Sequence, residues 1–134
     1  MTTFRRILVG WDGSASAEAA LRLAMTYAAG VKGEVTALWV LDRPIGEDGE
    51  QSPTPERRRV LEKFNAVFGA GGAQFHAIVG TTHPAHALNR FARDHGFDLI
   101  AVGRHSDDNT GDGDGTVHTL MAHAILPLLV VPAD

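Results

Sequence analysis

One loop of the sequence carries residue types that bind ions. Between a predicted strand that ends at Gly103 and a predicted helix that begins at Thr116, the chain reads RHSDDNTGDGDG. Glycines ahead of a helix allow a phosphate to approach its free N–H groups, whereas aspartates repel a phosphate and attract a divalent cation. The stretch therefore indicates a phosphate site, a metal site or a solvated spacer. Its acidic residues are Asp107, Asp108, Asp112 and Asp114.

Dedicated metal sites and catalysis are the weaker interpretations. A calcium loop that started at Asp108 would have Thr119 at its twelfth position, where a bidentate glutamate is needed. His83 and His86 lie three residues apart on one predicted helix, but the sequence identifies no further zinc ligands, so surface histidines are favoured. Ser14 or Ser106 beside a histidine does not form a nucleophile motif. We expect no enzyme.

The elements that must position these residues alternate regularly. Apolar runs typical of strands buried in a parallel sheet lie at 7–11, 34–41, 74–80, 98–103 and 128–131. Apolar spacing and capping residues predict helices that begin near Ser14, Pro55, Pro84 and Thr116, the first of them stopping at Gly30. The alternation predicts a single α/β domain over 1–134, a doubly wound, Rossmann-like sandwich with a five-stranded parallel sheet and about four helices. The polar, Pro- and Gly-rich segment 43–54 is predicted to be a flexible loop.

The composition limits the classes of partner and chemistry that are expected for this protein. Apolar residues make up 44% of the chain and charged residues 21%, as in ordinary globular proteins. A net charge of -4 gives no reason to expect nucleic acid or an anionic membrane as a partner. The absence of cysteine excludes disulfides and thiolate chemistry. With no apolar run of membrane-spanning length and no secretion signal, a cytoplasmic location is expected.

Ligands of such sheets bind beyond the carboxyl ends of the strands. Two predicted strand ends carry unusual residues, WDGS after the first and GRHS after the fourth. The helix start at Thr116 would offer the N–H groups of Val117 and His118 to an anion, and Arg104 or His105 would supply positive charge. Each feature also has a simpler explanation as a turn, a strand end or a helix cap.

The ordered set of motifs resembles the universal stress protein family over nearly the whole chain. The matching stretches are ILVGWDGSASAEAALRLA (7–24), LWVLD (38–42), DLIAVGRH (98–105) and GTVHTLMAHAILPLLVVP (115–132). The resemblance implies a five-stranded α/β sandwich, usually a homodimer, in a family of which one subgroup binds ATP and another does not. The binding subgroup carries Gly-x2-Gly-x9-Gly-[Ser/Thr]. Here Gly103 is followed after two residues by Ser106, and then after eight by Gly115 and Thr116.

By the same resemblance, Asp12 would bind the ribose hydroxyls and the main chain of Val40 would contact adenine. The predicted nucleotide-binding residues are Gly10, Trp11, Asp12, Val40, Val102, Gly103, Arg104, Ser106, Gly115, Thr116 and Val117. Magnesium or manganese, held by the loop aspartates together with the phosphates, would offset their repulsion of ATP.

Two hypotheses follow. The first is a small ATP-binding sensor of the stress response, which the presence of Asp12, Gly103, Gly115 and Thr116 favours. Under this hypothesis slow ATP hydrolysis, with His105 near the phosphates, stays open. The second is a dimeric interaction protein that has lost the nucleotide, which the altered glycine motif favours. In either case we expect a homodimer built on 128–132, because an apolar terminal strand at a sheet edge needs a cover.

Overall fold

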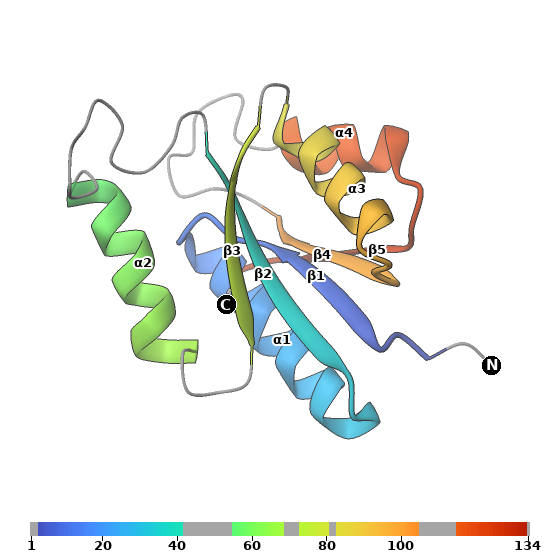
Figure 1. The fold of residues 1–134 in the computed structure, drawn as a ribbon, viewed down its shortest axis with the longest axis horizontal. Coiled ribbons are helices and arrows are strands. Elements are labelled where there is room, and N and C mark those ends of the chain that lie inside the picture. The colour runs from blue at the N-terminus through green and yellow to red at the C-terminus, as the bar shows by residue number, and fades with distance from the viewer. Residues whose placement is uncertain (1–2, 42–54, 69–72, 81–82, 105–114, 134) are drawn as a thin grey trace.

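The computed structural model contains the alternating strands and helices that the sequence predicts (Figure 1). It describes residues 3–41, 55–68, 73–80, 83–104 and 115–133. The elements in chain order are β1 (Arg6–Gly10), α1 (Ala15–Val31), β2 (Glu34–Leu41), α2 (Pro55–Phe68), β3 (Gln74–Val79), α3 (Pro84–Asp94), β4 (Leu99–Gly103), α4 (Gly115–His123) and β5 (Leu128–Val131). The predicted loop 43–54 lies outside the described residues.

All strand pairs of the sheet are parallel, and the order is β3-β2-β1-β4-β5. From β1 the chain moves outward through β2 to β3, then crosses back to β4 on the other side of β1. The order therefore reverses between β1 and β4, where Val9 pairs with Ala101. A crevice for a ligand is expected beyond the carboxyl ends of these two strands.

The sheet is covered on both faces, because successive strand residues point to opposite sides. Val9 belongs to the core beneath α1 and α2, whereas Leu8 belongs to the core beneath α3 and α4. Figure 1 shows α3 and α4 together, on the opposite side of the picture from α2. Burial on both faces explains why the central strands β1 and β4 read as continuous apolar runs, whereas β3 at the edge of the sheet is largely exposed.

The helices α1 and α2, which cover the same face of the sheet, pack against it with side chains of different size. The buried positions of α1 include Ala17, Ala20, Ala24 and Ala28, which let its backbone approach the sheet. Those of α2 include Phe64 and Phe68, whose rings fill the wider space between this helix and the sheet. None of the described helices is long and apolar enough to cross a lipid bilayer.

The predicted end of the first helix at Gly30 is wrong by a small margin. Gly30 lies inside α1 with open space around it, and the helix continues to Val31. Lys32 then adopts a left-handed conformation with a φ of 58°, and its N–H group donates to the carbonyl oxygen of Ala28. The left-handed cap that glycine usually provides is here made by a lysine.

Candidate functional site

The turn after β1 presents Asp12 at the carboxyl edge of the sheet. Its Oδ1 accepts a hydrogen bond from the Ser14 N–H at 2.9 Å, and the residue itself is exposed. Gly13 has a φ of 80°, which a residue with a side chain rarely adopts. Ser14 Oγ accepts from the Ala17 N–H at 3.1 Å and so caps α1. One oxygen of the carboxylate is therefore fixed, which orients the other.

Ser14 is committed to this cap. Its side chain is buried, and its hydroxyl oxygen already binds the helix N–H group. The prediction that the first helix begins at this serine is confirmed.

The end of β4 packs directly against the start of α1. A Cβ atom at Gly103 would lie 2.4 Å from Ser16 Oγ and 2.5 Å from the Ser16 carbonyl carbon, too close for any side chain. A Cβ atom at Gly10 would lie 3.2 Å from Val102 Cγ1. The predicted residues Gly10, Val102 and Gly103 are thus brought together with the Asp12 turn. Packing alone accounts for the glycine at position 103.

Trp11 follows β1 instead of ending it, which corrects the predicted strand 7–11. Its N–H group donates to the Leu38 carbonyl oxygen at 2.9 Å. Its ring is 2% exposed and meets the rings of Phe64 and Phe68 edge-on, with centroids 5.8 Å apart in each pair. The indole Nε1 is buried and has no hydrogen-bond partner among the described residues. The Trp11 side chain therefore belongs to the core beneath α2.

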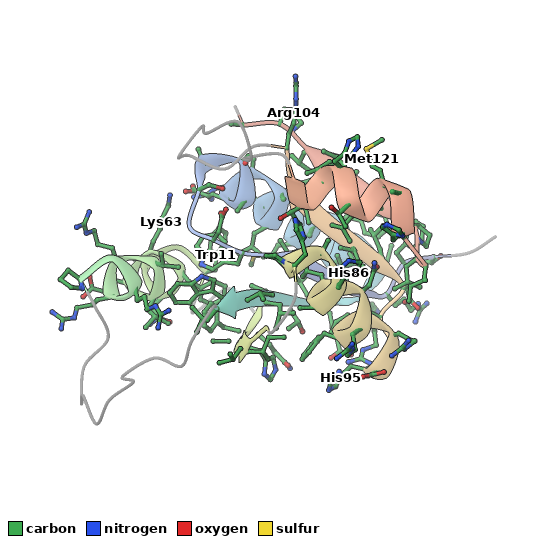
Figure 2. The ribbon with its side chains drawn as sticks, turned by 90° about the horizontal axis from the view of Figure 1, so that it is seen from above. Trp11, Lys63, His86, His95, Arg104 and Met121 are labelled. Carbon is green, nitrogen blue, oxygen red and sulfur yellow. The ribbon has the colours of Figure 1, made fainter. Side chains whose placement is uncertain are left out.

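The remaining predicted residues that the structure describes lie around the same edge. Val40 is half-buried near the end of β2 and packs on the α3 and α4 side of the sheet. Arg104 is exposed, and its N–H group donates to the Val131 carbonyl oxygen at 2.8 Å. In Figure 2 its side chain points away from the body of the molecule. Gly115 to Val117 form the first turn of α4, where backbone N–H groups lack helical partners.

The structure does not describe the acidic loop between β4 and α4. Ser106 and the four aspartates predicted to bind a metal, Asp107, Asp108, Asp112 and Asp114, lie outside the described residues. Within the described ranges, no group of three or more histidine, aspartate or glutamate side chains is arranged to hold a metal ion.

The histidines that the structure describes are surface residues, as expected, but three of them lie close together. His83, His86 and His123 are all exposed. Ring centroids are 6.3 Å apart for His83 and His86, and 5.7 Å apart for His86 and His123. His83 also caps α3, since its Nδ1 accepts from the Ala85 N–H at 3.1 Å. The sequence places His83 and His86 on one helix, but nothing in it indicates that His123 joins them.

Lys63 is the residue that sequence reasoning missed. The alternating charges of α2 predict a solvated face, yet Lys63 Nζ donates to the Gly13 carbonyl oxygen at 2.9 Å and lies 3.4 Å from Glu18 Oε1. Arg22 donates to Glu18 Oε2 at 2.8 Å. The hydrogen bond from Arg22, followed by that from Lys63, holds the pKa of Glu18 below its usual range. No sequence signal links position 63 to position 13.

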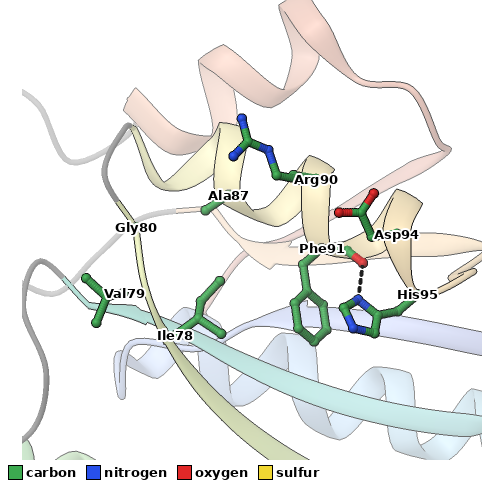
Figure 3. A pocket seen from close by; sticks show the side chains of 8 residues that line it. All are labelled: Ile78, Val79, Gly80, Ala87, Arg90, Phe91, Asp94 and His95. Atoms are coloured by element: carbon green, nitrogen blue, oxygen red, sulfur yellow. Dashed lines mark hydrogen bonds between the residues drawn. The ribbon is translucent and has the colours of Figure 1, made fainter.

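A separate hollow of about 170 Å³ lies between the end of β3 and α3 (Figure 3). Ile78 and Phe91 form apolar parts of its lining, and Arg90 and His95 contribute polar ones. The His95 ring stacks on Phe91 with centroids 4.1 Å apart. None of the predicted binding residues lines this hollow.

The parallel sheet with reversed strand order and helices on both faces defines a doubly wound α/β protein. The model of the universal stress protein family matches residues 3–132, so the chain belongs to this family.

Solved structures share the fold. A universal stress protein family member from Burkholderia pseudomallei has 26% identity and a TM-score of 0.68, with 99% of each chain covered. A universal stress protein in complex with cAMP has 20% identity and a TM-score of 0.69, covering 99% of this chain and 100% of its own. One from Archaeoglobus fulgidus in complex with dAMP has 19% identity and a TM-score of 0.69, covering 97% and 99% respectively. Among curated proteins, no sequence matches the chain.

Proposed function

We propose that this protein is a small regulatory module that binds an adenine nucleotide, with ATP as the expected ligand, in the crevice beyond β1 and β4. The observation that carries the proposal is the Asp12 turn at the reversal of strand order, where one carboxylate oxygen is fixed by the Ser14 N–H group at 2.9 Å. The carboxylate is exposed and so is available to a pair of ribose hydroxyls. Two structures of the same fold contain cAMP and dAMP, which supports adenine as the base.

The other roles follow from the order of the elements around the crevice. The main chain at Val40 would contact the adenine edge. The N–H groups at the start of α4, from Gly115 to Val117, would bind phosphate with the positive end of the helix dipole behind them. Gly103 and Arg104 would border the phosphates at the end of β4, with Ser106 beyond them. We assign no catalytic residue, and the cytoplasm remains the expected location.

The proposal is tested by binding. Freshly purified protein is denatured, and any released nucleotide is identified by mass spectrometry. ATP is then titrated into wild type and Asp12→Ala while the fluorescence of Trp11 and Trp39 is followed. Loss of the charged hydrogen bonds to ribose is expected to weaken binding about tenfold or more. Equal affinity in both proteins would place the nucleotide elsewhere, and no binding to wild type would refute the proposal.

The acidic loop predicts a dependence on metal. Each unscreened like-charge contact near a protein surface costs on the order of 1 kcal/mol or more, so ATP should bind markedly better with magnesium or manganese than in EDTA. Replacing Asp107, Asp108, Asp112 and Asp114 by asparagine should reduce that dependence and improve binding of metal-free ATP. Calorimetric titration of ATP into the wild type and the asparagine variant, each in excess magnesium and in EDTA, tests this prediction. Equal affinity throughout would make the aspartates a solvated spacer.

A second candidate function is that of a dimeric interaction protein without nucleotide. Packing of Gly103 against Ser16 favours it, because this glycine is then needed whether or not a phosphate binds. β5 lies at an edge of the sheet, and Met121 and Ile125 just before it are 68% and 55% exposed. We propose that the homodimer forms there, on residues 128–132. Light scattering at micromolar concentration tests it, and a monomeric mass would refute it.

A further inference from the structure

A lysine of α2 reaches the turn that carries Asp12. Lys63 Nζ donates to the carbonyl oxygen of Gly13 at 2.9 Å, and Gly13 stands between Asp12 and Ser14. Figure 2 draws Lys63 and Trp11 on the same side of the view. The bond joins α2 to a turn that lies 50 residues earlier in the chain.

Apolar side chains of α2 also pack against this turn. Val60 is so close that a Cβ atom at Gly13 would lie 3.1 Å from its Cγ2. Phe64 and Phe68 pack edge-on against Trp11, the residue before Asp12. α2 therefore contacts the turn from Trp11 to Gly13 through its aromatic rings, through Val60 and through Lys63.

We propose that Lys63 is a positioning residue for the nucleotide: by holding the Gly13 carbonyl it fixes the direction of the Asp12 carboxylate, so that affinity depends on whether α2 is docked. This inference rests on the proposed function. A glycine with positive φ has wide conformational freedom, so a turn released from Lys63 samples more orientations. Binding must then order the turn, which lowers the affinity.

Arg22 provides a matched control. Both Lys63 and Arg22 bind Glu18, at 3.4 Å and 2.8 Å. Lys63→Met and Arg22→Met each remove one positive charge and one partner of Glu18. In the contacts described above, Lys63 alone of the two binds the Gly13 carbonyl. The difference between the variants therefore isolates that bond from the general effect of charge on an anionic ligand.

The first measurement is ATP affinity by calorimetry in excess magnesium. Lys63→Met is expected to weaken binding about five- to tenfold. A hydrogen bond from a charged group is lost, and ordering the turn on binding then costs part of its free energy. Arg22→Met should change affinity less than twofold. Lys63→Arg, which keeps a cationic donor, should restore most of it. A merely structural role would lower thermal stability without this pattern of affinities.

The second measurement needs no nucleotide. Amide hydrogen exchange of the ligand-free protein reports on the Ser14 and Ala17 N–H groups, which bind Asp12 Oδ1 and Ser14 Oγ. Both should exchange several-fold faster in Lys63→Met and at the wild-type rate in Arg22→Met.

The outcomes separate the two ideas. If wild type binds ATP and Lys63→Met keeps both its affinity and its slow exchange, the positioning role is refuted and the proposed function stands. Wild-type protein that binds no ATP refutes the proposed function and, with it, the effect of Lys63 on affinity. Faster exchange in Lys63→Met alone would then still show that Lys63 holds the turn.

Discussion

The turn after the central strand β1 and the edge strand β5 differ in how many of their groups have partners within the chain. Around the turn after β1, Asp12, Ser14 and Gly13 all have partners, and Gly103 leaves no room for a side chain. Around β5, the strand is only half-buried over Leu128–Val130, and Met121 and Ile125 ahead of it are exposed. The first region is complete within one chain, whereas the second leaves apolar surface uncovered. A turn that is held in one conformation before binding lowers the cost of ordering it around a ligand.

The largest effect is expected from Gly103→Ala. The added Cβ atom would lie 2.4 Å from Ser16 Oγ and 2.6 Å from the Ala17 nitrogen, so α1 or β4 must shift. We expect a loss of about 3 kcal/mol in the free energy of unfolding, measured by urea denaturation. Gly30→Ala is the control, because it meets no atom within 4 Å and is expected to be neutral or stabilising by up to about 1 kcal/mol. A mild effect of Gly103→Ala would mean that this contact is loose.

The next largest effect concerns the β5 region. Replacing Met121 and Ile125 by aspartate puts charge onto surface that the proposed dimer covers, and should raise the dimer dissociation constant about a hundredfold. Leu23→Asp is the control, since Leu23 is 45% exposed on α1. Analytical ultracentrifugation over a concentration series measures both. If the two proteins dissociate alike, the interface lies elsewhere.

Ser14→Ala should cost about 1 kcal/mol, the usual effect of removing an N-cap. The Ala17 N–H group loses its acceptor, which lies 3.1 Å away in the wild type. The change is measured by urea denaturation, and Ser14→Asp should recover most of the stability by capping the same helix. An effect below a few tenths of a kcal/mol would show that the cap is dispensable.

The smallest expected effect is the pH dependence due to Glu18. Its pKa is lowered in the folded state, mainly by Arg22 and then by Lys63, so its contribution is present above the unfolded value of about 4.3. The contribution is lost as pH falls through the folded-state pKa. Between pH about 6 and 3, wild type should lose a few tenths of a kcal/mol more than Glu18→Gln, since such pairs are partly exposed. Parallel curves for the two proteins would contradict it.

Local chemistry explains what the sequence could predict. Apolar periodicity gives the five strands, the four helices and the cap at Ser14, because each depends on neighbouring residues. The Lys63–Gly13 bond and the contact between Gly103 and Ser16 join distant segments, so no local pattern announces them. The burial of Trp11 is likewise a contact between distant segments that the sequence does not predict. Trp11 reads as a strand residue near the site, whereas only the packing of α2 reveals that its ring is buried.

The strand order has a consequence for synthesis of the chain. β4 is the neighbour of β1, and the Asp98 carboxylate just before it accepts from the Arg6 N–H group, 92 residues earlier. In a growing polypeptide β1 can pair with β2 early. The other edge of β1, which pairs with β4 in the folded sheet, has no partner strand until β4 has left the ribosome. The nascent chain therefore carries an uncovered central strand for most of its translation. The proposed crevice, which needs β1, β4 and α4, is assembled last.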